Sequence, residues 1–175
     1  MLMREQHIIS NLAHQVITHC IHHHFTIATA ESLTGGLLAS SLVSIPGASA
    51  VFLGSFITYN LHAKEHILHV NHHLLEQAGA VNKDTAQQMT WGTRSYYQTI
   101  APNKENLICI STTGVAGPDS DGYQPVGLVY IALNDNNHTI IREYHFDGTR
   151  QEIREKTVAA ALSMLAHIPY SYEKE

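Results

Sequence analysis

Apolar side chains recur along this chain with two different periods, and their alternation predicts an α/β fold. Helical stretches return an apolar residue every three or four positions, as at Ile8, Leu12 and Val16. Short runs rich in β-branched and aromatic residues indicate strands. The predicted helices span 4–23, 36–44, 61–68, 71–78, 83–99 and 149–168. The predicted strands span 25–29, 51–59, 107–112, 126–133 and 139–146.

Several residues support these boundaries or qualify them. Asn82 is a suitable cap for the helix that follows it, and Thr149 with Glu152 has the sequence of a capping box. Gly54 indicates a bulge or a close neighbour inside its strand, because a glycine there gives up side-chain packing. Gly92 is unfavourable in the middle of its helix.

The order of the elements predicts a three-layer α/β/α sandwich around a mixed sheet of about five or six strands. The polar segment 134–137 predicts a turn that joins the last two strands into an antiparallel hairpin, which the C-terminal helix follows. No internal repeat, low-complexity tract or linker interrupts the chain. We therefore expect a single domain over residues 1–175.

Composition narrows the class of protein. Hydrophobic residues make up 44% and charged residues 14%, as in a globular domain, and the formal net charge of −5 comes without a run of Lys or Arg. This argues against a nucleic-acid surface. No signal peptide and no apolar stretch of membrane-spanning length are found, so we expect a cytoplasmic protein without a membrane partner. Cys20 and Cys109 lie among apolar neighbours and are interpreted as buried thiols.

Histidine is unusually frequent, with 14 residues. His62 and His66, and likewise His69 and His73, have the i, i+4 spacing of a helical metal pair, but no HExxH or CxxC motif accompanies them. We interpret the histidines as surface residues and predict no metal site. A histidine metal hydrolase is the weaker alternative.

The segment from Glu31 to Gly36 is the first candidate functional loop, because it follows a predicted strand and opens a helix. In open α/β sheets, ligands bind at this carboxyl edge. First-turn amides and the paired glycines Gly35 and Gly36 suit an oxyanion or a phosphate. Ser32 then lies where a nucleophile for acyl transfer is needed. The alternative is that Ser32 and Thr34 only cap the helix.

Tyr59 and Lys64 form the second candidate, since Tyr59 ends a predicted strand and Lys64 follows one helical turn later. Lysine acts as a general base only when burial or a nearby cation lowers its pKa towards roughly 7–8. A solvated lysine on a short helix is the alternative.

Two further segments follow predicted strands. The glycine-rich stretch 111–119, with Thr113, Gly114 and Gly117, suits an oxyanion or phosphate cradle, although a tight turn explains it equally well. Arg150 begins the last helix, where a guanidinium suits a phosphate or carboxylate. An ordinary surface arginine is the alternative.

Four motifs taken in order resemble the CinA C-terminal domain family. They are the segments 30–36, Tyr59 with Lys64, 113–119 and 125–127. Members are nicotinamide mononucleotide deamidases, and the domain also occurs fused in the competence/damage-inducible protein CinA. The resemblance covers about 26–165. The chain lacks the large N-terminal domain of full CinA and so resembles the stand-alone form.

The resemblance implies a small-molecule mononucleotide substrate, hydrolysis of its carboxamide to nicotinate mononucleotide and ammonia, no cofactor, and a homodimer or larger homo-oligomer. It also implies a catalytic group of Ser32 as nucleophile, Lys64 as base and Tyr59 as a hydrogen-bonding helper. The residues implied to bind substrate are Glu31, Thr34, Gly35, Gly36, Thr113, Gly114, Gly117 and Arg150.

Two questions stay open at the level of sequence. The nucleophile is Ser32 or a hydroxyl of the later segment, Ser111 or Thr113. The alternative function is a non-catalytic module that binds a nucleotide or a competence- or damage-linked partner.

Overall fold

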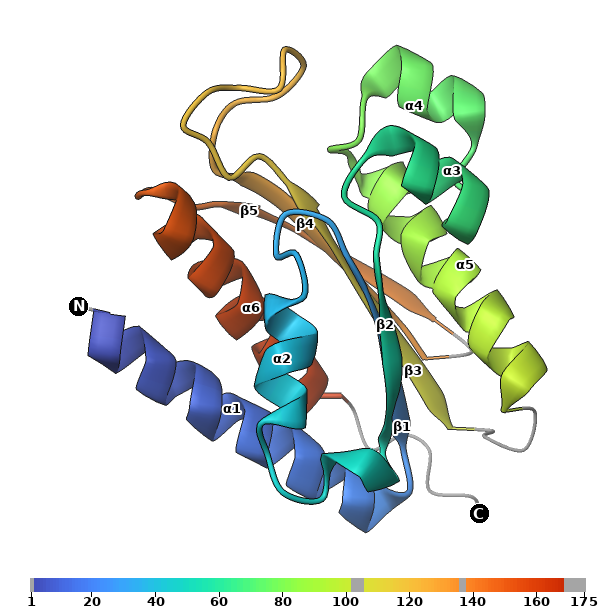
Figure 1. Ribbon diagram of the computed structural model, residues 1–175, viewed down its shortest axis with the longest axis vertical. Helices are drawn as coiled ribbons and strands as arrows, with labels where there is room; N and C mark the ends of the chain where they lie inside the picture. Colours follow the sequence, from blue (N-terminus) through green and yellow to red (C-terminus); the bar gives the residue numbers. More distant parts are fainter. Residues whose placement is uncertain (1, 102–105, 136–137, 169–175) are drawn as a thin grey trace.

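A mixed five-stranded sheet with the order β2-β1-β3-β4-β5 forms the centre of the protein (Figure 1). The computed structural model describes residues 2–101, 106–135 and 138–168, with side chains from residue 5 onwards. β1, β2 and β3 run parallel, while β4 is antiparallel to both of its neighbours. The strands are β1 (Thr26–Glu31), β2 (Phe52–Ile57), β3 (Leu107–Gly114), β4 (Leu128–Asn134) and β5 (Thr139–His145).

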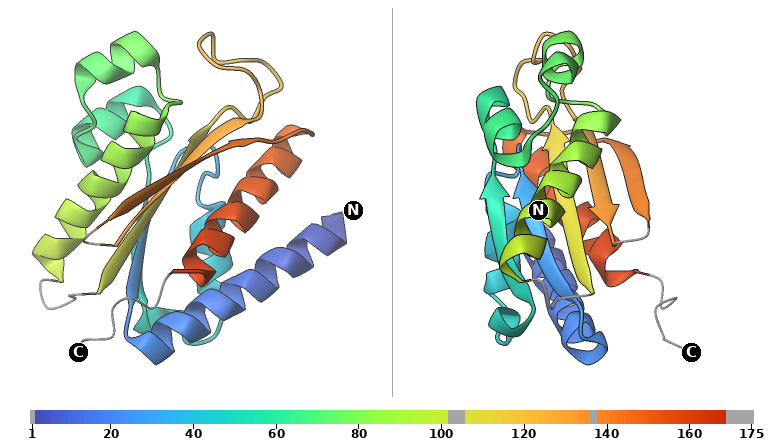
Figure 2. Two further views of the ribbon diagram at one scale, coloured as in Figure 1. Left: turned by 180° about the vertical axis from the view of Figure 1, so that it is seen from behind. Right: turned by 90° about the vertical axis from the view of Figure 1, so that its right-hand side faces the viewer.

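Helices cover both faces of this sheet, which confirms the predicted three-layer sandwich (Figures 1 and 2). One face carries α1, α2 and α6, and the other carries α3, α4 and α5. The larger apolar core lies on the α1–α2–α6 side, where α1 packs mainly against α6. The helices are α1 (Leu2–His23), α2 (Leu37–Val43), α3 (Leu61–Leu68), α4 (His72–Ala78), α5 (Lys83–Ile100) and α6 (Arg150–Ala166), with a 3₁₀ turn at Ala48–Ala50.

The predicted hairpin and both predicted helix caps are confirmed. β4 and β5 pair antiparallel, and the amide of Asp135 donates to the carbonyl of His138 at 3.1 Å. Residues 136–137 of the predicted turn lie outside the described residues. The Asn82 side chain accepts from the third residue of α5, and Thr149 forms a complete capping box at α6.

The two unusual glycines mark close approaches between elements. Gly54 has φ +146°, the ladder shifts register opposite it, and a Cβ there would overlap the Tyr97 hydroxyl. A Cβ on Gly92 would overlap the Leu68 carbonyl. Glycine lowers the stability of α5 at this position, but it lets α3, the helix that carries Lys64, pack closely against α5.

Three strands extend beyond their predicted ends: β4 by one residue, to Asn134, and β1 and β3 by two residues each at the candidate site. β1 continues to Glu31, and β3 continues to Gly114. The apolar pattern missed Glu31 and Thr113 because both are polar although they are buried. Thr112 and Thr113 have no exposed surface, and neither does Glu31.

Candidate active site

The carboxyl ends of β1, β2 and β3 meet at one edge of the sheet, as parallel strands require. The loops that follow these strands gather there together with the start of α6 (Figure 1). This is the edge at which open α/β sheets bind ligands. The predicted site segments therefore come together although they are up to 119 residues apart, from Glu31 to Arg150.

Lys64 reaches across from α3 to Ser32 at the end of β1. Its Nζ lies 2.8 Å from Ser32 Oγ and also donates to the carbonyls of Thr58 at 2.6 Å and Tyr59 at 3.2 Å. Lys64 is fully buried and Ser32 is 6% exposed. Asn60 caps α3 by accepting from the amide of Ala63 at 2.8 Å, which fixes the first turn from which Lys64 projects.

Burial lowers the pKa of Lys64 from its ordinary value of 10.5 to about 8. The cause is desolvation of the ammonium, since the oxygens that accept from Nζ are neutral. In the neutral amine, the carbonyls of Thr58 and Tyr59 take the two remaining hydrogens. The lone pair then faces Ser32 Oγ, which is the arrangement a general base needs.

The other two candidate nucleophiles point away from this pair. Ser111 Oγ donates to the carbonyl of Ala86 at 2.6 Å, and Thr113 Oγ1 donates to that of Ala80 at 2.7 Å. Both hydroxyls thus tie β3 to the start of α5 and its preceding loop. Among the three candidates, Ser32 is the one whose hydroxyl lies within hydrogen-bond distance of Lys64 Nζ.

The expectation that Thr113 and Gly114 belong to a loop is wrong, because both pair with β4 as the end of β3. The Thr113 side chain is buried and already bonded. A Cβ on Gly114 would meet Val129 Cγ2 at 2.6 Å and the Leu128 carbonyl at 2.8 Å. Gly114 therefore permits the close pairing of β3 with β4.

The expectation that first-turn amides of α2 are free for a ligand is also wrong. The carboxylate of Glu31 accepts from the amides of Gly36, Leu38 and Ala39 at 2.8, 3.1 and 2.8 Å. Glu31 is the last residue of β1 and has no exposed surface, so its carboxylate occupies the helix N-terminus from within. Here the protein supplies its own anion to the helix dipole.

Thr34 is likewise turned inward. Its Oγ1 shares a 2.8 Å hydrogen bond with Thr112 Oγ1, and neither side chain is exposed. The amide of Gly35 donates to the carbonyl of Ser32 at 3.1 Å, and Gly36 adopts a left-handed conformation (φ +93°) as the residue before α2. The Ser32 loop is thus a tight turn held on the ends of β1 and β3.

Arg150 joins three of the predicted site segments. Its Nη1 donates to the carbonyl of Gly117 at 2.6 Å, and its Nη2 donates to the hydroxyl of Tyr59 at 2.7 Å. Tyr59 contacts Lys64 through its backbone carbonyl, while its ring is 59% exposed. The Tyr59 hydroxyl therefore belongs to the rim of the site beside Arg150.

Sequence reasoning missed Arg154, which lies one helical turn after Arg150 on α6. Its Nε donates to the carbonyl of Leu33 at 3.0 Å, and its Nη2 donates to that of Thr34 at 2.8 Å. The i, i+4 spacing of the two arginines was the available signal, because residues so spaced lie on one face of a helix.

Several histidines lie beside other histidines, as His19, His22 and His23 do on α1. His72 lies 3.1 Å from Glu65 and 3.2 Å from Glu76, and these carboxylates raise the pKa of His72. Within residues 2–101, 106–135 and 138–168, no group of three or more His, Cys, Asp or Glu side chains could hold a metal ion. Across the same residues, no helix has the length and apolar character that crossing a membrane requires.

Fold and site together define an α/β protein with a buried serine–lysine pair at the carboxyl edge of its parallel strands. The chain belongs to the CinA C-terminal domain family, whose sequence profile matches residues 9–168.

Relatives named competence-damage inducible protein include one from Clostridium botulinum (strain Loch Maree / Type A3), 44% identical over 157 residues. Another, from Desulforamulus reducens, is 46% identical over 142 residues. These matches cover 89% and 81% of this chain but only 37% and 33% of the relatives, so the chain spans about a third of their length.

Solved structures match over nearly their whole chains. The competence/damage inducible protein CihA from Agrobacterium tumefaciens is 38% identical with a TM-score of 0.80, over 90% of this chain and 93% of that one. The competence damage-inducible protein A (ComA) from Klebsiella pneumoniae is 27% identical with a TM-score of 0.84, over 95% and 99%. The fold is therefore that of the CinA superfamily.

Proposed function

We propose that this protein is an amidohydrolase that converts nicotinamide mononucleotide to nicotinate mononucleotide and ammonia. The observation that carries the proposal is the buried 2.8 Å contact between Lys64 Nζ and Ser32 Oγ. A lysine with no exposed surface and a pKa of about 8 is unusual unless its neutral form is used. Membership of the CinA C-terminal domain family supports the same reaction.

In the proposed mechanism, neutral Lys64 takes the proton of Ser32 while Oγ bonds to the carboxamide carbon. The carbonyl oxygen becomes the oxyanion of a tetrahedral intermediate. The carbon–nitrogen bond then breaks as the Lys64 ammonium returns its proton to the leaving nitrogen, so ammonia departs and an ester remains on Ser32. Water attacks this ester with Lys64 as base, the product acid leaves, and Oγ recovers its proton.

The substrate class suits the surroundings of the pair. A pyridinium ring withdraws electrons from its carboxamide and so makes that carbon more electrophilic. A guanidinium has five donors, and the contacts of Arg150 with Gly117 and Tyr59 use two of them. The exposed Arg150 therefore retains donors for the phosphate.

The predicted site residues divide by how they act in this proposal. Arg150, Tyr59 and the exposed Gly35 contact the substrate at the rim. The others act through the framework that places Ser32, and they are Glu31, the side chain of Thr34, Gly36, Thr113, Gly114 and Gly117.

The test is the release of ammonia from nicotinamide mononucleotide by the purified protein, with the Ser32→Ala and Lys64→Ala variants alongside. We expect turnover by the parent and a loss of at least about 1,000-fold in kcat for each variant. Ser40→Ala, which changes an exposed serine on α2, serves as the matched control. Rapid-quench mass spectrometry of the parent should show an acyl adduct on Ser32.

Two results would overturn the assignment. Ligand-induced melting shifts without product would favour a non-catalytic nucleotide-binding module. Equal turnover by the parent and both variants would remove the serine–lysine mechanism.

A further inference from the structure

The proposed reaction needs donors for an oxyanion, and most amides near Ser32 are already used. The amide of Ser32 donates to the carbonyl of Thr112 at 2.9 Å, and that of Gly35 donates to Ser32. The amides of Gly36, Leu38 and Ala39 are taken by Glu31. The amides of Leu33 and Thr34 make no hydrogen bond to any residue that the structure describes.

Arg154 binds the peptide group that carries one of these remaining amides. Its two hydrogen bonds draw the carbonyls of Leu33 and Thr34 towards α6. In a trans peptide the N–H points opposite to the C=O, so the N–H of Thr34, which shares a peptide with the Leu33 carbonyl, points away from α6.

The direction of the Thr34 amide matters because α6 and α3 lie on opposite faces of the sheet. α6 covers the same face as α1 and α2, whereas α3 with Lys64 lies on the other face (Figures 1 and 2). An amide that points away from α6 is therefore turned towards the side from which Lys64 reaches Ser32 Oγ. A cation on the carbonyl also polarises the peptide and makes its N–H a stronger donor.

We propose that Arg154 is a positioning residue that turns the Leu33–Thr34 peptide so that the Thr34 amide stabilises the oxyanion formed at Ser32. This inference rests on the proposed amidase function and deepens it. Arg154 itself touches neither substrate nor reacting atoms: Nε and Nη2 bind the loop, and Nη1 donates to Gln151 at 3.1 Å. The half-buried guanidinium acts only through the backbone.

The test compares Arg154→Gln with the matched Arg142→Gln. Arg142 is exposed on β5 and lies near Ser163 and His167, at the far end of α6. Because the oxyanion exists only after attack, Arg154→Gln should lower kcat for nicotinamide mononucleotide by about 10- to 100-fold with KM within about twofold. Arg142→Gln should leave both constants at the parental values.

A second readout does not depend on the substrate. A fluorophosphonate phosphonylates an activated serine: Oγ bonds to phosphorus, fluoride leaves, and the proton passes to Lys64. The rate at which Ser32 is labelled should fall in Arg154→Gln by a factor similar to that in kcat. Arg154→Lys keeps the charge, but its ammonium can bind only one of the two carbonyls with good geometry. Its kcat and labelling rate should therefore lie between those of the parent and Arg154→Gln.

The outcomes separate the two proposals. If the parent labels at Ser32 but releases no ammonia, the amidase assignment is overturned. The labelling rates of parent and Arg154→Gln then test the role of Arg154 on their own. An unchanged kcat and labelling rate in folded Arg154→Gln, an increase in KM alone, or a parent that does not label at all overturns the positioning role. If Arg154→Gln does not fold, parental rates in Arg154→Lys also overturn it.

Discussion

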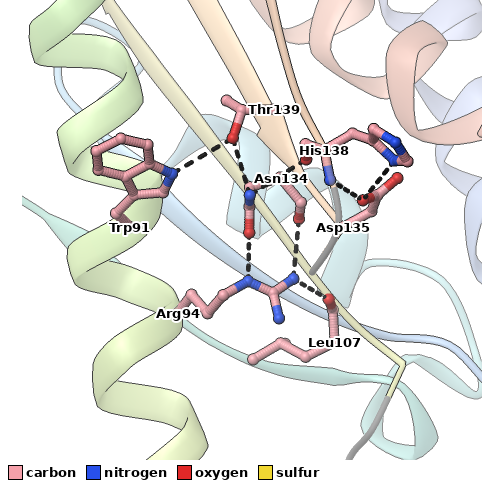
Figure 3. Close-up of polar contacts among 7 residues, drawn as sticks. All are labelled: Trp91, Arg94, Leu107, Asn134, Asp135, His138 and Thr139. Carbon is pink, nitrogen blue, oxygen red and sulfur yellow. Dashed lines mark hydrogen bonds and ion pairs between the residues drawn. The ribbon is translucent and has the colours of Figure 1, made fainter.

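Two buried cations, at opposite ends of the sheet, show how the same burial leads to different chemistry. Lys64 lies at the carboxyl ends of the parallel strands and bonds to Ser32 Oγ and two carbonyls. Arg94 on α5 lies near the start of β3, where it donates to the Asn134 side chain and to the carbonyls of Asn134 and Leu107 (Figure 3). Lys64 has no exposed surface, and Arg94 is 8% exposed.

The difference lies in what each cation does when water is removed. A guanidinium stays charged because its pKa lies far above neutral, and its planar fork holds several acceptors at once. An ammonium loses its proton more readily, so burial lowers the pKa of Lys64 to about 8. Arg94 therefore joins α5 to β3 and β4, while burial leaves Lys64 with a lowered pKa, as the proposed base requires.

Replacing the ammonium at Lys64 with a guanidinium should have the largest effect on activity. Lys64→Arg keeps a positive charge but cannot supply a neutral nitrogen, so kcat should fall by about 1,000-fold or more. Steady-state kinetics measures the loss, and circular dichroism checks the fold. Parental kcat in Lys64→Arg would show that deprotonation at this position is not needed.

Replacing the guanidinium at Arg94 with an ammonium should affect stability rather than activity. An ammonium in Arg94→Lys cannot reach both Asn134 and Leu107, which leaves buried acceptors unpaired and lowers the free energy of unfolding by about 2–3 kcal/mol. Urea denaturation measures this change, and the exposed Arg142→Lys should stay within about 0.5 kcal/mol of the parent. A large loss of kcat in folded Arg94→Lys would contradict the purely structural role.

The pH dependence of the parent should give the smallest effect. Below pH 8, kcat/KM should fall about tenfold per pH unit, because only neutral Lys64 accepts the serine proton. Between about pH 8 and 10.5 the unfolded chain binds more protons at Lys64 than the folded one, so the free energy of unfolding should rise with pH in this window relative to Lys64→Met. Parallel stability curves for parent and Lys64→Met would show that burial does not lower this pKa.

The features that could be predicted from the sequence are those that depend on neighbouring residues. The capping box at Thr149, the cap at Asn82 and the final hairpin follow from neighbouring residues, and all three are confirmed. The pairing of Ser32 with Lys64 was within reach because both follow strand ends that topology brings to one edge. The role of Glu31 could not be predicted, since it depends on β1 running two residues beyond its predicted end.

The hydroxyls of β3 are a second case in which the sequence alone could not predict the contacts. Ser111 and Thr113 share one side of β3, and the structure binds them to the carbonyls of Ala86 and Ala80. The sequence left both hydroxyls open as alternatives to Ser32, which the family resemblance implies as the nucleophile. Only the packing of α5 distinguishes them, and no local pattern encodes it.

By itself, the sequence determined the order of the elements, the mixed sandwich and the edge at which the predicted site segments lie, because periodicity, capping and strand order are encoded locally. The tertiary structure decided which hydroxyl meets Lys64, which carboxylate occupies the amides of α2, and which arginine binds the carbonyls of the Ser32 loop. Those choices depend on which way a side chain or a peptide points at the end of a strand. A shift of one residue reverses that direction, and contacts between distant elements select it.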